Sequence, residues 1–209
     1  MEAIIGVDIG QKVDPTAIVV VQPEWREDVI HFLVRHLERL PLRTTYPAVA
    51  DRLVNLQTAI DKDNKEARCT FWVDATGVGQ PVVDLLRSKK LKIKAVYITG
   101  GDRRREETDA LYLPKALLVS RLQVLLQSER IHLPKTVEAE ALAKELLDYE
   151  IHVSDDGADT YGAFKTGAHD DLVTALGLAC WEEPRKPLDP LTREMFRRAS
   201  FYTPIFESF

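Results

Sequence analysis

The chain opens with an almost unbroken apolar run over residues 3–10, in which one carboxylate, Asp8, stands near the end. A run rich in β-branched residues is typical of a strand that is buried on both faces of a sheet. Residues 16–22 form a second apolar run, and apolar positions roughly alternate with polar ones over residues 29–40. Short polar turns separate these segments, so the pattern predicts a three-stranded antiparallel meander with a turn starting at Pro23.

Helical and extended patterns then alternate along the middle of the chain. Apolar residues recur at helical spacing over residues 46–62, and a second buried strand is expected at residues 69–74. Residues 75–88 read as a small-residue loop followed by a helix, and residues 92–98 as a further strand. A strand, a helix and a strand in this order predict a parallel pair with a right-handed crossover.

The last third of the chain predicts three helices and a hairpin. The helices are expected at about residues 114–128, at residues 136–148 and from Asp170 to about residue 181, with a loop at residues 101–108 before the first. The hairpin is expected within residues 149–165.

Together these elements indicate an α/β fold with a mixed sheet, in which an antiparallel three-strand meander joins parallel strands and helices flank the sheet. We expect one domain at residues 1–182, followed by an irregular, proline-rich tail or arm at residues 183–209.

The composition of the chain excludes some classes of function but does not identify one. The 209 residues are enough for one domain with a sizeable core, and the 45% hydrophobic content is ordinary for a globular protein. A net charge of −5 excludes a strongly cationic nucleic-acid-binding protein, so any contact with DNA depends on local basic patches and bound metal. No apolar run reaches the length of a membrane span, and neither cysteine, Cys69 or Cys180, has a metal-binding spacing.

Carboxylates stand at places that this topology brings together. Asp8 lies near the end of the first strand, Asp74 ends the strand expected beside it, and Asp170 and Asp171 open the final helix. In a sheet flanked by helices, sites form where strand ends and helix N-termini meet. Because clustered carboxylates repel one another, the arrangement predicts two Mg²⁺ or Mn²⁺ ions between them. Such a centre cleaves phosphodiesters, since one ion activates a water and the other stabilises the leaving oxygen.

Each of these residues alone also has a structural explanation. Asp8 could accept hydrogen bonds from backbone amides, and Asp74 could form a turn with the residues that follow it. Asp170 and Asp171 could cap the final helix, where the helix dipole favours acids. The metal interpretation depends on all of them pointing to one place.

Five basic residues are candidate DNA contacts around such a centre. They are Arg103, Arg104, Arg105, Lys165 and His169. The three arginines could clamp a phosphate or could form an ordinary solvated loop, and the histidine could assist proton transfer or simply begin a helix.

The order of these segments resembles a known family. The segments that carry the resemblance are residues 6–10 with 14–17, 73–79, 114–122 with 130–134, and 167–176. Their arrangement resembles the ribonuclease H-like fold and, more closely, the nuclease domain of the large terminase subunit of tailed bacteriophages. The resemblance spans about residues 3–181.

The resemblance implies an endodeoxyribonuclease that cuts double-stranded viral DNA when genome packaging begins and ends. Carried over by position, Asp8, Asp74 and Asp171 are the catalytic metal ligands, Asp170 is an auxiliary ligand, and His169 lies at the rim. The implied partners are double-stranded DNA, the terminase ATPase domain, the portal and the small terminase, in the host cytoplasm and away from any membrane. The Gly-Lys-Ser/Thr phosphate-binding loop of the ATPase does not occur in this sequence, so we expect no ATP hydrolysis.

Three other functions stay open at this point. ATP-handling proteins of the sugar-kinase and actin type also open with a Val-Asp-Ile-Gly strand, but they carry two copies of the domain, and this chain has length for one. A Holliday-junction-resolvase-like nuclease would prefer branched DNA. A non-catalytic module that docks a packaging motor would show neither cleavage nor an effect of divalent metal on stability.

Overall fold

The computed structural model of the protein describes residues 1–10, 14–148, 150–153, 159–162 and 170–186. The strands are β1 (Glu2–Asp8), β2 (Ala17–Arg26), β3 (Val29–Arg39), β4 (Arg68–Asp74), β5 (Ile93–Thr99), β6 (Arg105–Glu106), β7 (Ala110–Pro114), β8 (Ile131–His132), β9 (Glu150–Val153) and β10 (Asp159–Gly162). The helices are α1 (Tyr46–Asp63), α2 (Gly79–Ser88), α3 (Lys115–Gln127), α4 (Val137–Asp148) and α5 (Asp171–Ala179).

One mixed sheet organises the molecule. Its strand order is β6-β7-β5-β4-β1-β2-β3-β8, and β9 pairs separately with β10. Strands β1, β2 and β3 are antiparallel neighbours, while β4 runs parallel to β1 and β5 runs parallel to β4. The predicted meander and the predicted parallel crossover are therefore both confirmed.

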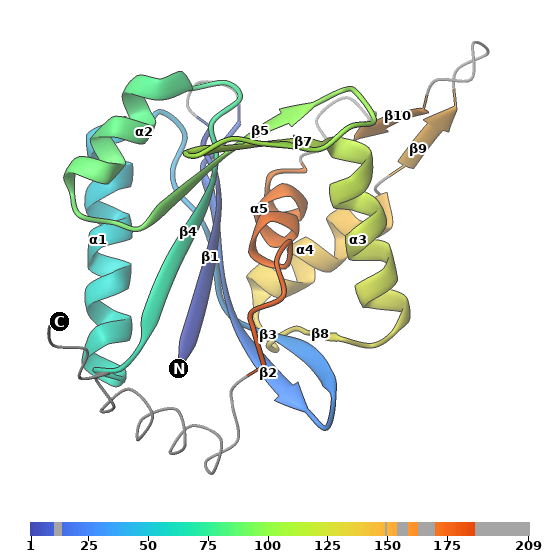
Figure 1. Ribbon diagram of the computed structural model, residues 1–209, viewed down its shortest axis with the longest axis horizontal. Coiled ribbons are helices and arrows are strands. Elements are labelled where there is room, and N and C mark those ends of the chain that lie inside the picture. Colours follow the sequence, from blue (N-terminus) through green and yellow to red (C-terminus); the bar gives the residue numbers. More distant parts are fainter. Residues whose placement is uncertain (11–13, 149, 154–158, 163–169, 187–209) are drawn as a thin grey trace, which may run out of the picture.

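Helices cover both faces of the sheet. Figure 1 shows α1 and α2 on one face and α3, α4 and α5 on the other. Because side chains alternate along a strand, β1 contributes to two cores: Ile5 and Val7 pack with α1 and α2, whereas Ile4 packs with the other three helices. All nine residues of α5 are buried. Among the described residues, no helix is both long and apolar enough to cross a membrane.

Two local predictions are wrong. The turn expected at Pro23 is absent there, because β2 continues to Arg26 and the chain turns at Glu27, whose φ is 55°. Proline is tolerated here because the pairing of β2 with β1 ends at Val21, and beyond it β2 pairs only with β3. The N–H that proline lacks would therefore face no partner strand. The segment expected as a loop at residues 101–108 contains β6, and it leads into β7, a strand that the sequence did not predict.

The close approach of α5 to β1 depends on a glycine. A Cβ atom built at Gly6 would lie 1.8 Å from the carbonyl oxygen of Ala175 and 2.9 Å from the amide nitrogen of Ala179, so only glycine allows this packing. Asp8 lies two positions after Gly6 along β1, and Asp171 lies four positions, about one helical turn, before Ala175 in α5. Both separations are about 6 Å, so the packing brings the start of α5 beside the end of β1.

Candidate metal centre

Asp8 and Asp74 end neighbouring parallel strands. They are partners in the register between β1 and β4, and paired residues of adjacent strands lie on the same face. Asp8 lies two positions after Gly6 in β1, so both residues face the same side of the sheet. The backbone of α5 packs directly against Gly6, so the carboxylates of Asp8 and Asp74 lie on the α5 face. Neighbouring strands are about 4.8 Å apart, which places the two acids side by side.

The second pair of acids comes from the start of α5. Asp170 is the N-cap residue of α5 and Asp171 is its first residue, where the positive end of the helix dipole stabilises carboxylates. Asp171 is 3% exposed. Asp170 makes no side-chain cap hydrogen bond; its Oδ2 lies 2.7 Å from Nζ of Lys115, the first residue of α3.

Electrostatics links these acids into one group. Burial raises the pKa of Asp8 well above its ordinary value, and repulsion from Asp74, Asp170 and Asp171 raises it further, while Lys115 lowers it in part. A carboxyl group with a raised pKa holds its proton unless a cation compensates the charge.

Asp74 is oriented by the loop that follows β4. Its Oδ1 accepts hydrogen bonds from the Thr76 amide at 2.8 Å and from the Thr76 hydroxyl at 2.5 Å. The same hydroxyl accepts a bond from the Ile98 amide at 2.7 Å. Burial raises the pKa of Asp74, and the two bonds from Thr76 hold it down in part. These bonds fix the orientation of the Asp74 carboxylate.

An arginine that the sequence interpretation did not single out joins the group. Arg39 ends β3, and the register runs straight across the sheet from Arg39 to Ala17, to Asp8 and to Asp74. Its Nε donates to Oδ2 of Asp171 at 2.6 Å. The sequence does show that Arg39 is a charged residue at the end of a half-buried strand, on the same side of the sheet as the end of β1. It does not show that Arg39 lies in line with Asp8, because that register depends on a bulge between β2 and β3 at Val20.

The acids suit a hard divalent cation by chemistry, since all their donors are oxygens. As they stand, however, no three His, Cys, Asp or Glu side chains in the described ranges are arranged to hold a metal ion together. Two of the acids are instead bound by cations of the chain, Asp170 by Lys115 and Asp171 by Arg39. The structure thus brings Asp8, Asp74, Asp170 and Asp171 to one end of the sheet, and their roles as metal ligands stay predictions.

The candidate DNA contacts are not gathered in the same way. Arg104 forms an ion pair with Glu106, and Arg105 lies 4.0 Å from the ring centre of Tyr112 and pairs with Glu107. These contacts are local to β6 and β7, at the edge of the sheet. The proposed phosphate clamp of residues 103–105 stays a prediction. Lys165 and His169 lie outside the described residues.

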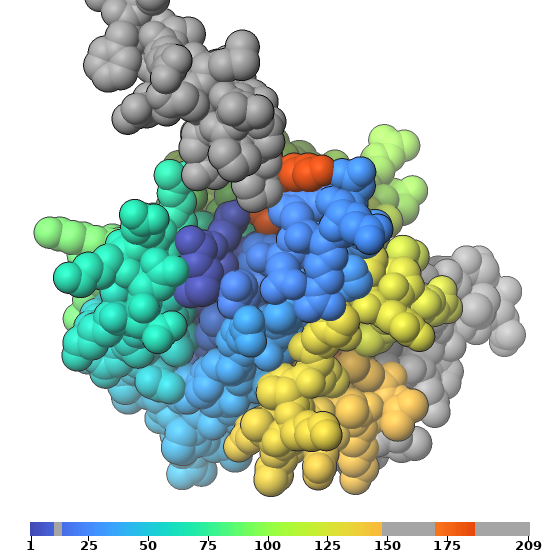
Figure 2. All heavy atoms as spheres, turned by 90° about the horizontal axis from the view of Figure 1, so that it is seen from below, coloured from blue at the N-terminus to red at the C-terminus, as the bar shows by residue number. Residues whose placement is uncertain are grey.

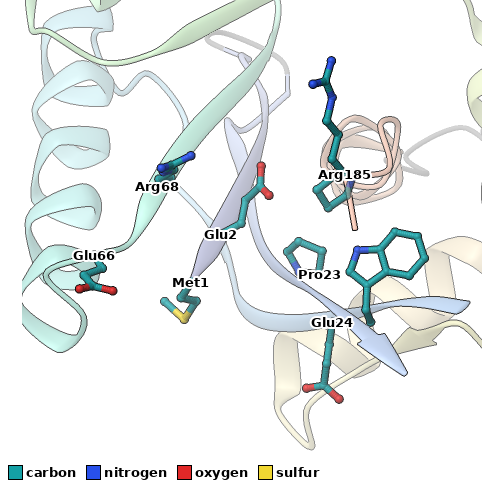
Figure 3. A pocket seen from close by; sticks show the side chains of 9 residues that line it. Met1, Glu2, Pro23, Glu24, Glu66, Arg68 and Arg185 are labelled. Carbon is teal, nitrogen blue, oxygen red and sulfur yellow. The ribbon is translucent and has the colours of Figure 1, made fainter. Parts of the chain in front are cut away.

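A hollow of about 920 Å³ opens at the opposite end of β1. Figure 3 shows its lining, which comes from the start of β1, the end of β2, the start of β4 and the segment after α5. In Figure 2 the dark-blue start of the chain lies at this end of the molecule, between the blue strands and the teal segment that includes β4. The lining residues are Met1, Glu2, Pro23, Glu24, Trp25, Glu66, Arg68, Pro184 and Arg185. None of them belongs to the carboxylate group, so this hollow is a separate feature.

Comparison with known proteins identifies the family. The profile of the terminase RNase H-like domain matches residues 5–183. The chain belongs to this family. The recognition of a terminase nuclease domain and of the ribonuclease H-like fold class is therefore confirmed. In the described part of this terminase domain, the matched range covers the five helices and the eight-stranded sheet except the first three residues of β1. Among curated proteins, none matches the chain significantly.

Solved structures share the fold of this terminase domain. The large terminase nuclease from thermophilic phage G20c with bound magnesium aligns over 86% of this chain and 80% of its own, at 21% identity and a TM-score of 0.60. The nuclease domain of the large terminase subunit gp2 of bacterial virus Sf6, a K428A mutant with manganese and beta-thujaplicinol, aligns over 88% and 89%, at 14% identity and 0.59. The g2p nuclease domain from bacteriophage SPP1 with bound Mn aligns over 86% and 85%, at 12% identity and 0.54.

Proposed function

We propose that this terminase domain is a metal-dependent endonuclease that cuts double-stranded viral DNA during genome packaging. One observation carries the proposal: half-buried and buried acids from two parallel strands and one helix start lie at a single end of the sheet, where burial and then repulsion among them raise the pKa of Asp8. Such an arrangement is unfavourable unless cations compensate it. Family membership and neighbours with bound magnesium or manganese support the same function.

The residues that would hold two Mg²⁺ or Mn²⁺ ions are Asp8, Asp74, Asp170 and Asp171. When bound, the ions would supply an activated water and stabilise the leaving oxygen of a phosphodiester. Asp8 would release its proton as the site is loaded, because burial and its acidic neighbours hold that proton in the metal-free protein.

The rest of the proposed role concerns partners. We propose that the domain acts in the host cytoplasm with a terminase ATPase domain, the portal and the small terminase, as the family implies. Arg103, Arg104 and Arg105, together with Lys165 and His169, are the proposed contacts to the DNA backbone, where basic side chains bind without reading sequence.

The test is cleavage of a supercoiled plasmid and of linear duplex DNA in Mn²⁺, with the wild type and with two variants. Asp8→Asn is expected to abolish cutting while the far-ultraviolet circular dichroism spectrum stays unchanged. Asp63→Asn is the matched control, because Asp63 is an exposed acid at the end of α1. Cutting by Asp8→Asn at the wild-type rate would refute the site. A strong preference for four-way junctions over both substrates would instead favour a resolvase.

A further inference from the structure

Arg39 connects two helices at the candidate metal centre. Its Nε donates to Asp171 Oδ2 on α5 at 2.6 Å, and its second terminal nitrogen forms an ion pair with Glu145 Oε1 on α4. The side chain of Asp171 is 4% exposed and that of Glu145 is 12% exposed, so one guanidinium bridges two carboxylates that are largely removed from water.

The shape of the guanidinium explains why arginine stands here. Its nitrogens form a rigid planar fork, so two of them can bind two carboxylates at a fixed angle, which a lysine ammonium cannot do. Arg39 is itself anchored by the sheet, because its backbone lies in the register row of Ala17 and Asp8. The fork therefore fixes where the Asp171 carboxylate lies relative to Asp8.

Glu145 takes part in this arrangement at a cost in stability. Its Oε2 is buried, and within the described residues it has no hydrogen-bond partner. A buried carboxylate oxygen without a partner is unfavourable, and buried ion pairs in general add little to stability compared with apolar residues of similar size. What Glu145 does provide is a second anchor that holds the Arg39 fork in place.

We propose that Arg39 is a positioning residue that holds Asp171 ready to bind a divalent cation, and that Glu145 holds Arg39. The inference rests on the proposed function, since it assigns Asp171 to the metal site. Groups that orient metal-binding side chains through hydrogen bonds typically change metal affinity by about 10- to 100-fold when they are removed. Arg39 touches neither substrate nor metal in this account and acts only through Asp171.

The test is the dissociation constant for Mn²⁺, measured by isothermal titration calorimetry without DNA. We expect Arg39→Gln and Glu145→Gln each to weaken Mn²⁺ binding about 10-fold or more. Arg39→Lys keeps the charge but loses the fork, so it should recover only part of the affinity. The matched control is Arg52→Gln. Arg52 lies on α1, and its Nε forms an ion pair at 2.9 Å with Oε1 of Glu38, the β3 residue next to Arg39. This variant therefore also removes an ion pair between β3 and a helix, but away from the acids.

The readout separates positioning from simple structural support. A purely structural role would lower the melting temperature of Arg39→Gln and of Arg52→Gln without changing Mn²⁺ affinity. The inference requires weaker Mn²⁺ binding in Arg39→Gln and Glu145→Gln, and unchanged binding in Arg52→Gln. If Arg39→Gln does not fold, Glu145→Gln carries the same expectation. Affinities within twofold of the wild type for the folded variants, or tighter binding, would overturn the inference. If the wild type itself binds no Mn²⁺ and does not cut DNA, it is the proposed function that fails.

Discussion

Replacing Asp8 by asparagine should stabilise the metal-free protein while removing its metal response. The change keeps the shape of the side chain and deletes its charge. Asp8 and Asp74 are register partners on strands about 4.8 Å apart, and two ionised carboxylates at that distance repel by about 3 kcal/mol at an effective dielectric constant of about 20. The raised pKa of Asp8 lets the wild type relieve part of this repulsion, so we expect Asp8→Asn to gain about 1–3 kcal/mol at pH 8.

The sign of the pH dependence follows from the direction of the shift. The pKa of Asp8 is raised in the folded state, so the folded protein holds a proton that the unfolded chain has lost. The contribution of Asp8 to the free energy of unfolding is complete below the ordinary carboxyl pKa of about 3.9. It is lost as the pH rises from there through the raised pKa of the folded state. Asp8→Asn has no such group, so its advantage over the wild type should grow with pH across this window.

Thermal unfolding in EDTA and in Mn²⁺ measures both effects. For a chain of this size each kcal/mol shifts the melting temperature by about 2–4 °C, so Asp8→Asn should melt several degrees above the wild type in EDTA at pH 8. Mn²⁺ at about 100 times its dissociation constant should stabilise the wild type by about 2.7 kcal/mol and leave the variant unchanged. Asp63→Asn should follow the wild type in both media. A variant that melts below the wild type in EDTA, or that gains as much from Mn²⁺, would refute the reasoning.

Three further changes test the surroundings of the site. Gly6→Ala should destabilise by more than about 3 kcal/mol in a denaturant titration, because its Cβ would overlap the backbone of Ala175; a change below about 1 kcal/mol would show that α5 does not pack as described. Thr76→Val removes the hydroxyl bond to Asp74 and should lower stability by about 1–2 kcal/mol and weaken Mn²⁺ binding; unchanged binding would argue against an orienting role. Burial raises the pKa of the Cys180 thiol to about 12, so it should resist a thiol reagent at pH 8 until the protein unfolds; rapid labelling of the native state would contradict its burial.

The sequence predicted the part of the site that depends on chain topology. The strands that end in Asp8 and Asp74 are long apolar runs, and the predicted mixed sheet makes them neighbours, so their meeting needed no knowledge of side-chain packing. The sequence also predicted that the last helix begins at Asp170 and Asp171, because acids are favoured at a helix start.

What the sequence could not predict depends on register and on helix packing. Arg39 reaches the site only because β2 and β3 pair with a bulge, and Glu145 reaches it because α4 packs against β3. Strand β7 was missed because its five residues continue directly into α3, and a short apolar run cannot be told from the start of a helix by periodicity.

Anomalous diffraction from crystals grown with Mn²⁺ would locate the metal ions themselves. We expect manganese peaks bounded by the carboxylates of Asp8, Asp74 and Asp171, with these side chains closer together than in the metal-free structure. Well-ordered crystals in saturating Mn²⁺ with no anomalous peak at that end of the sheet would contradict it.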